Sequence, residues 1–134
     1  MGTSFSFNLK PEINIEPSIY PLNPFKFLSI SDFDGHIEGF TMILRGEGVI
    51  DSNFNWTYGN GHLIISGDLF DRGFHITECM WLLYKLESEA AIAGGKVHLI
   101  IGNHEIMNMT DDWRYVDVKY FNVKLSKFFG YNIL

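Results

Sequence analysis

The chain has almost no cysteine, no long apolar run and too few basic residues to offset its acidic ones. Cys79 is the single cysteine, which excludes an internal disulfide framework and a zinc site built from cysteines. No apolar run reaches the roughly 20 residues of a membrane-spanning helix, and residues 1–10 lack the basic start and apolar core of a secretory signal. We therefore expect a cytoplasmic protein with no membrane partner.

The charge balance argues against nucleic acid as a partner. Ten Lys and Arg residues stand against sixteen Asp and Glu residues, which gives a net charge of −6. Broad binding to nucleic acid needs a basic surplus that neutralises phosphates, and this chain has the opposite balance. Carboxylates gathered at one site can instead be neutralised by divalent cations, so the acidity is compatible with a metal-dependent hydrolase.

The prolines divide the chain into an arm and a domain. All four lie within residues 1–24, a stretch without a sustained hydrophobic period, which predicts an extended N-terminal arm. The remaining residues, 25–134, are enough for one domain and no more.

Strand and helix patterns alternate along that domain. Short apolar runs predict strands over 25–31, 62–66 and 97–101. Helical spacing of apolar residues predicts helices over 36–45 and 76–93, the second with Cys79, Met80, Leu83, Leu86 and Ala90 on one side. The order strand, helix, strand, helix, strand indicates an α/β fold with a parallel sheet and helices packed on it.

Three polar loops follow the three predicted strands, where a parallel α/β sheet collects its functional groups. Asp32 and Asp34 stand after the first strand, Asp68 after the second and Asn103 after the third. Carboxylate and amide oxygens suit Mg²⁺, Mn²⁺ or Fe, and the two oxygens of Asp68 could bridge two such ions. These four residues are the candidate metal ligands.

The same loops contain groups that suit phosphate chemistry. Arg72 has a planar fork that fits a phosphate dianion. His104 can protonate a leaving oxygen if a carboxylate such as Asp71 orients its other ring nitrogen.

Each loop also has a structural interpretation. The pair Asp32 and Asp34 could be turn residues, Asp71 with Arg72 a surface ion pair, and Asn103 a helix N-cap. Their joint occurrence, each after its own strand, favours a functional site.

The segments Gly-Asp-x-x-Asp-Arg-Gly at 67–73 and Gly-Asn-His-Glu at 102–105 resemble two signatures of the calcineurin-like metallophosphoesterase superfamily. The continuation over 106–116 resembles the Shewanella-like branch of its phosphoprotein phosphatases, and the resemblance extends over about residues 26–120. It implies the N-terminal βαβαβ half of an α/β sandwich, and hydrolysis of phosphomonoesters in small molecules or phosphoproteins.

The resemblance also implies two divalent ions (Mn, Fe, Zn or Mg) and a metal-activated hydroxide that attacks phosphorus. The implied roles are first-metal ligation by Asp32, metal bridging by Asp68, second-metal and phosphate binding by Asn103, phosphate binding by Arg72, and an acid dyad of His104 and Asp71.

Two departures from the family pattern stand out. The first signature usually carries His where this chain has Asp34, which exchanges a nitrogen ligand for a charged oxygen ligand. His36 could compensate by reaching back, or it could be a partly exposed polar residue. The other histidines before His104, namely His62, His75 and His98, are interpreted as structural.

The second departure is that no histidine follows His104, although the family completes its site with histidines from a C-terminal half. Residues 118–129 have helical spacing, and the chain reads as truncated, retaining one metal ion or none. The alternative to an enzyme is a non-catalytic remnant that acts as a partner or metal-binding domain. Half a sandwich would leave a sheet uncovered, which predicts a homo-oligomer.

Overall fold

The structure, a computed structural model, describes residues 6, 8–12 and 26–122. Most of the expected arm over 1–24 lies outside these residues, as does the part of the expected helix beyond residue 122. Of the helices in the described ranges, none combines the length and apolar character that crossing a bilayer requires.

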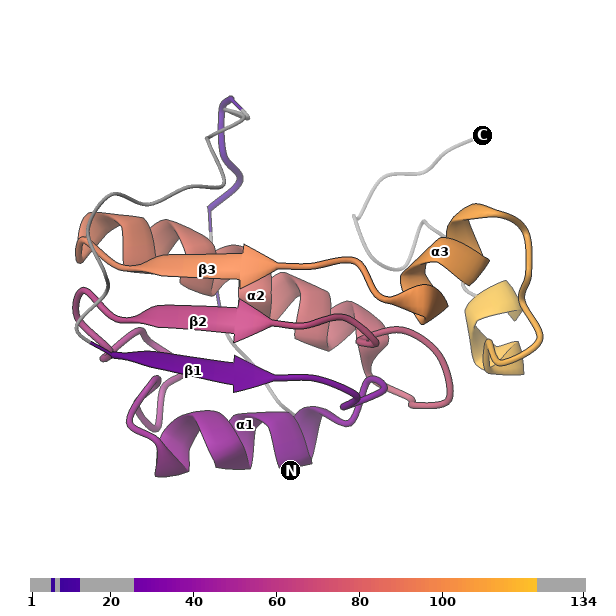
Figure 1. The fold of residues 1–134 in the computed structure, drawn as a ribbon, viewed down its shortest axis with the longest axis horizontal. Coiled ribbons are helices and arrows are strands. Elements are labelled where there is room, and N and C mark those ends of the chain that lie inside the picture. The colour runs from indigo at the N-terminus through magenta and orange to yellow at the C-terminus, as the bar shows by residue number, and fades with distance from the viewer. Residues whose placement is uncertain (1–5, 7, 13–25, 123–134) are drawn as a thin grey trace.

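Three short strands form a parallel sheet (Figure 1). Strands β1 (Phe27–Ile30), β2 (His62–Ile65) and β3 (Lys96–Leu99) pair in the order β1-β2-β3. Both pairings are parallel. One helix connects β1 to β2, and another connects β2 to β3. The predicted α/β fold is therefore confirmed.

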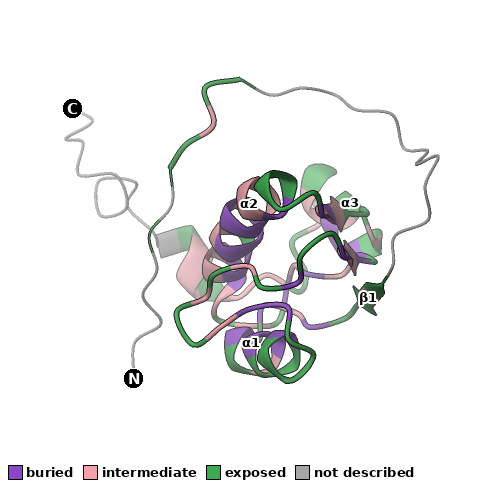
Figure 2. Ribbon diagram, turned by 90° about the vertical axis from the view of Figure 1, so that its left-hand side faces the viewer, coloured by how far each residue is buried: buried purple, intermediate pink, exposed green. Residues whose placement is uncertain are grey.

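Two amphipathic helices cover one face of this sheet. Helices α1 (Ile37–Gly46) and α2 (Ile76–Ile92) lie on the same side of the strands in Figure 2. His36 caps the N-terminus of α1, because its Nδ1 accepts a hydrogen bond from the Gly39 N–H at 3.0 Å. A short helix, α3 (Asn103–Met109), and a 3₁₀ turn at Val118–Asn122 follow β3.

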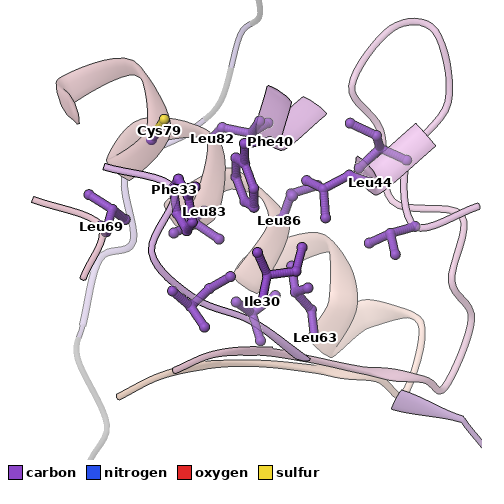
Figure 3. Close-up of a cluster of buried hydrophobic side chains, with 14 of the residues drawn as sticks. Ile30, Phe33, Phe40, Leu44, Leu63, Leu69, Cys79, Leu82, Leu83 and Leu86 are labelled. Carbon is purple, nitrogen blue, oxygen red and sulfur yellow. The ribbon is translucent and has the colours of Figure 1, made fainter. Parts of the chain in front are cut away.

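The core lies between the sheet and the two helices (Figure 3). Phe33 and Phe40 stack face to face with ring centroids 4.3 Å apart, and Phe40 is fully buried. Leu63 from β2 and Leu86 from α2 are also fully buried beside them. This packing fixes the positions of the strand ends, and therefore of the loops that leave them.

The other face of the sheet carries no described helix. The register places Phe27, His62 and Lys96 in one row on this face, with Ile64 and His98 in the next. Phe27 is 65% exposed. The His98 Nε2 and His62 Nδ1 atoms are 2.9 Å apart, in a hydrogen bond between two imidazoles. Oligomer formation through this face stays a prediction.

The histidine pair makes stability depend on pH. Burial lowers the pKa of His62 and His98 from the ordinary value of 6.5, and the charge of Lys96 lowers both further. The unfolded chain therefore takes up protons first as the pH falls through about 6.5. The contribution of the pair is complete above that pH and is lost towards the lower pKa of the folded state.

We expect the urea midpoint to fall between pH 7.5 and 5.5, and to fall less in a His62→Gln, His98→Gln double variant. An equal fall in the double variant and the unchanged chain would contradict this explanation.

Candidate active site

The loops after the three strands lie together at one edge of the sheet (Figure 1). The Asp32 N–H donates to the Gly67 carbonyl at 3.4 Å, and the Asp34 N–H donates to the Asp68 carbonyl at 3.3 Å. Gly67 has φ +89°, and a Cβ there would stand 2.7 Å from the Gly102 nitrogen, so this position requires glycine. The close approach of the backbones holds the three loops side by side.

Left-handed backbone conformation is concentrated in these loops. Five site residues other than glycine have positive φ, between 43° and 74°: Asp32, Asp34, Asp68, Asp71 and Arg72. Each such residue is less stable in this conformation than glycine would be, and persists only where the surroundings impose it.

A buried aspartate and a buried histidine form the centre of the site. The His104 Nδ1 and Asp71 Oδ2 atoms are 2.7 Å apart, and the two residues are 5% and 0% exposed. Asn108 donates from Nδ2 to Asp71 Oδ1 at 2.8 Å and to the His104 carbonyl at 3.0 Å. Asn108 thus fixes the carboxylate that orients the imidazole, a role that the sequence analysis did not identify.

The contact with Arg72 determines the tautomer of His104. Arg72 Nη2 lies 3.0 Å from His104 Nε2. A guanidinium only donates hydrogen bonds, so Nε2 is the acceptor and the ring proton sits on Nδ1, where it is donated to Asp71. The lone pair on His104 Nε2 therefore faces Arg72 and accepts its hydrogen bond.

Arg72 is held at three points. Its Nη1 donates to Asp34 Oδ1 at 2.7 Å, its Nη2 to His104, and its backbone N–H to the Tyr115 carbonyl at 3.0 Å. The hydrogen bond and charge of Asp34 raise the pKa of Arg72 above its ordinary value. The alternative that Arg72 pairs with its neighbour Asp71 is wrong, because Asp71 is engaged by His104 and Asn108.

Glu105 ties the second loop to the third. Its carboxylate accepts backbone N–H groups from Asp68 at 2.9 Å, Leu69 at 2.8 Å, Phe70 at 3.0 Å and Gly102 at 2.8 Å. Burial alone would raise the pKa of Glu105, but these four hydrogen bonds hold it below the ordinary value.

The role of Glu105 is one that the sequence analysis did not identify. The available signal was a glutamate three residues after the N-cap of a helix. The N-cap is Gly102, so the interpretation of Asn103 as N-cap is wrong, and Asn103 is the first residue of α3.

The predicted metal ligands lie in the three loops at this edge, and two of them are engaged by other groups. Asp34 is ion-paired with Arg72, Asp68 Oδ1 accepts the His104 N–H at 3.1 Å, and Asp32 and Asn103 are exposed. Among residues 26–122 and the described part of the arm, no three His, Cys, Asp or Glu side chains gather to hold a metal ion. The oxygen donors have the chemistry that divalent cations prefer, and their role as metal ligands stays a prediction.

A hollow of about 830 Å³ opens between the first two loops and α1. Asp32, Asp34 and Arg72 line it together with Phe74 and Glu38. His36 also borders it, and because its Nδ1 accepts the Gly39 N–H, its Nε2 is the atom that would serve as a replacement metal ligand.

A charged fork beside a histidine–aspartate pair, at the strand ends of a parallel sheet, is typical of enzymes that cleave phosphate esters. Comparison with known families agrees with this class. The sequence profile of the calcineurin-like phosphoesterases matches residues 25–133, and the chain belongs to that family.

Two curated relatives and one solved structure carry similar sequences. The chain is 40% identical over 96 residues to Shewanella-like protein phosphatase 2 of Arabidopsis thaliana, covering 72% of the chain and 25% of that protein. It is 39% identical over 94 residues to Shewanella-like protein phosphatase 1 of Plasmodium berghei, covering 70% and 26%.

The cold-active protein-tyrosine phosphatase of a psychrophilic Shewanella species superposes with a TM-score of 0.69 at 38% identity. That match covers 75% of this chain and 32% of the other. The chain thus spans about a quarter to a third of the relatives it matches, and its similarity to them confirms the predicted phosphatase lineage.

Proposed function

We propose that this chain supplies the acid and phosphate-binding groups of a metal-dependent phosphomonoesterase. The observation that carries the proposal is the continuous hydrogen-bonded line from Asp71 through His104 to Arg72, with contacts of 2.7 and 3.0 Å. An arginine that binds phosphate next to a histidine that can protonate its leaving oxygen is what such a reaction needs.

The chain's own residues would act in a fixed order. Arg72 would bind two phosphate oxygens through its fork. His104 would first take up a proton at Nε2 and then give it to the leaving oxygen. The Asp71 carboxylate would stabilise the imidazolium that exists between these two events, while Asn108 keeps that carboxylate in place.

Members of this family generally use two divalent metal ions. Asp32, Asp34, Asp68 and Asn103 would be the ligands from this chain, with Mn, Fe, Zn or Mg as candidate metals. When bound, such ions activate water and neutralise the attacking and leaving oxygens. The names of the relatives favour a phosphorylated protein as substrate, and a small phosphomonoester would satisfy the same groups.

A non-catalytic role, as a partner or metal-binding domain, is the second candidate, because two of the four oxygen donors already have partners: Asp34 is ion-paired with Arg72, and Asp68 accepts the His104 N–H. Four donors can hold one cation loosely, but a pair of octahedral ions needs more. The two candidates differ in what the isolated chain should do with a metal and with a substrate.

We expect the purified chain to bind Mn²⁺ weakly at one site, and to hydrolyse an aryl phosphate at a rate near background. Electron paramagnetic resonance of free Mn²⁺ should show binding that Asp68→Asn removes. Asp111→Asn should retain it, because this change removes an equal charge at an exposed position that also has positive φ. Substituting His104 by alanine should leave the low turnover unchanged.

Absence of Asp68-dependent Mn²⁺ binding would contradict the proposed role of these loops. Robust Mn²⁺-dependent hydrolysis that Asp68→Asn abolishes would support the enzyme. It would also show that the remaining ligands come from a second subunit.

A further inference from the structure

The arginine proposed to bind phosphate already has an anionic partner. The Arg72 Nη1 and Asp34 Oδ1 atoms are 2.7 Å apart, and the side chains are 52% and 26% exposed. Carboxylate oxygens and phosphate oxygens are both anionic acceptors that pair with a guanidinium. Asp34 therefore stands where an oxygen of a bound phosphate would stand.

The fork of Arg72 is occupied on both amino groups. Nη1 donates to Asp34 and Nη2 to His104 Nε2. These bonds use two of the five N–H donors of the guanidinium, so a phosphate that binds at this edge of the fork competes with one or both of these partners. His104 is buried and tied to Asp71, so Asp34, on the exposed side, is the partner that phosphate displaces more readily before the reaction begins.

The backbone holds the two loops that carry this pair close together. Asp34 has φ 43° and Arg72 has φ 54°, conformations that the loops hold in place. The Asp34 N–H donates to the Asp68 carbonyl, and a Cβ at Gly73 would collide with the Asp34 carbonyl oxygen. The two loops therefore approach each other so closely that Asp34 stays beside Arg72.

We propose that Asp34 is an internal competitor for phosphate at Arg72, which keeps the site weak for anions until its carboxylate is displaced. The inference rests on the proposed function of Arg72 as a phosphate ligand. Asp34 acts in two ways, because it occupies the guanidinium and its charge repels a phosphate dianion in the same hollow. Removing that charge should tighten phosphate binding about tenfold, an order of magnitude set by a partly exposed ion pair and a nearby like charge.

The test is a titration of the 134-residue chain with inorganic phosphate at pH 7.5 with a chelator present. Binding is followed at Arg72 itself through its ¹⁵N-labelled side-chain Nε–H signal. We compare the unchanged chain with Asp34→Asn, since asparagine keeps the size of the side chain and tolerates positive φ. Glu38→Gln is the matched control, because it removes the same charge from the same hollow and Glu38 has no described contact with Arg72.

Asp34→Asn should bind phosphate about tenfold tighter than the unchanged chain. The affinity of Glu38→Gln should differ from that of the unchanged chain by less than about twofold. Adding Arg72→Gln to Asp34→Asn should remove the gain in affinity. Equal tightening by Glu38→Gln would overturn the inference, because general charge would then explain the effect. Arg72-dependent binding of equal strength in the unchanged chain and in Asp34→Asn would also overturn it, while leaving the proposed function intact. No phosphate-induced shift at Arg72 in any variant would overturn both.

Discussion

Replacing Glu105 by alanine should lower the free energy of unfolding by about 3 kcal/mol, because it removes a charged acceptor shared by four backbone N–H groups. Glu105 is 4% exposed, so water reaches few of these donors once the carboxylate has gone. The loop after β2 would also lose one of its ties to α3. Urea unfolding followed by circular dichroism measures the change.

Two further variants test this explanation. Glu105→Gln should have an intermediate effect, since its amide oxygen still accepts while its amide nitrogen faces donors. Glu47→Ala, at an exposed position after α1, should change stability by less than about 0.5 kcal/mol. A Glu105→Ala chain as stable as the Glu47→Ala chain would show that the loop does not depend on this carboxylate.

Replacing Asp71 by asparagine should lower the free energy of unfolding by about 2 kcal/mol and change the tautomer of His104. Asp71 accepts from two donors, the His104 Nδ1–H and the Asn108 amide. Asparagine has one acceptor oxygen, so one of these buried donors would face an amide N–H instead. The stability change is measured by urea unfolding.

The tautomer of His104 is measured separately by the ¹⁵N chemical shifts of its imidazole. A loss of stability without a change of tautomer would leave these shifts unchanged. The unchanged chain should show the proton on Nδ1, and Asp71→Asn should move part of the population to Nε2. Asp112→Asn, which breaks an exposed ion pair with Arg114, should leave the His104 signals in place. An unaltered Nδ1–H signal in Asp71→Asn would refute the assignment of Asp71 as the orienting group.

The periodic features of the fold were predictable because they depend on local patterns. Apolar runs predicted the three strands of the described residues, and helical spacing placed α1 and α2 within one residue of their ends. The error at Met80 shows the limit of the method. Its spacing put it with the buried side of α2, whereas it is 44% exposed, one position past the buried Cys79.

The candidate site was only partly predictable, because its contacts join distant parts of the chain. The sequence placed Asp71 beside His104, and these residues are hydrogen-bonded. The partners of Glu105 in the second loop lie 35 to 37 residues away, and Asp34 pairs with Arg72 across 38 residues. No period or spacing reports such pairs. The roles of the metal ligands stay predictions.

The five left-handed residues of the site also bear on how such a sequence can change over generations. Every aspartate codon and every arginine codon can become a glycine codon by one base substitution. Glycine adopts the left-handed backbone conformation at a lower energetic cost than the residues found there, which are Asp32, Asp34, Asp68, Asp71 and Arg72. At the exposed Asp32 in particular, a single-base change would remove a side chain proposed to bind metal and ease the backbone at once. Once selection for catalysis is relaxed, mutational drift towards glycine should therefore erode this site before it erodes the fold.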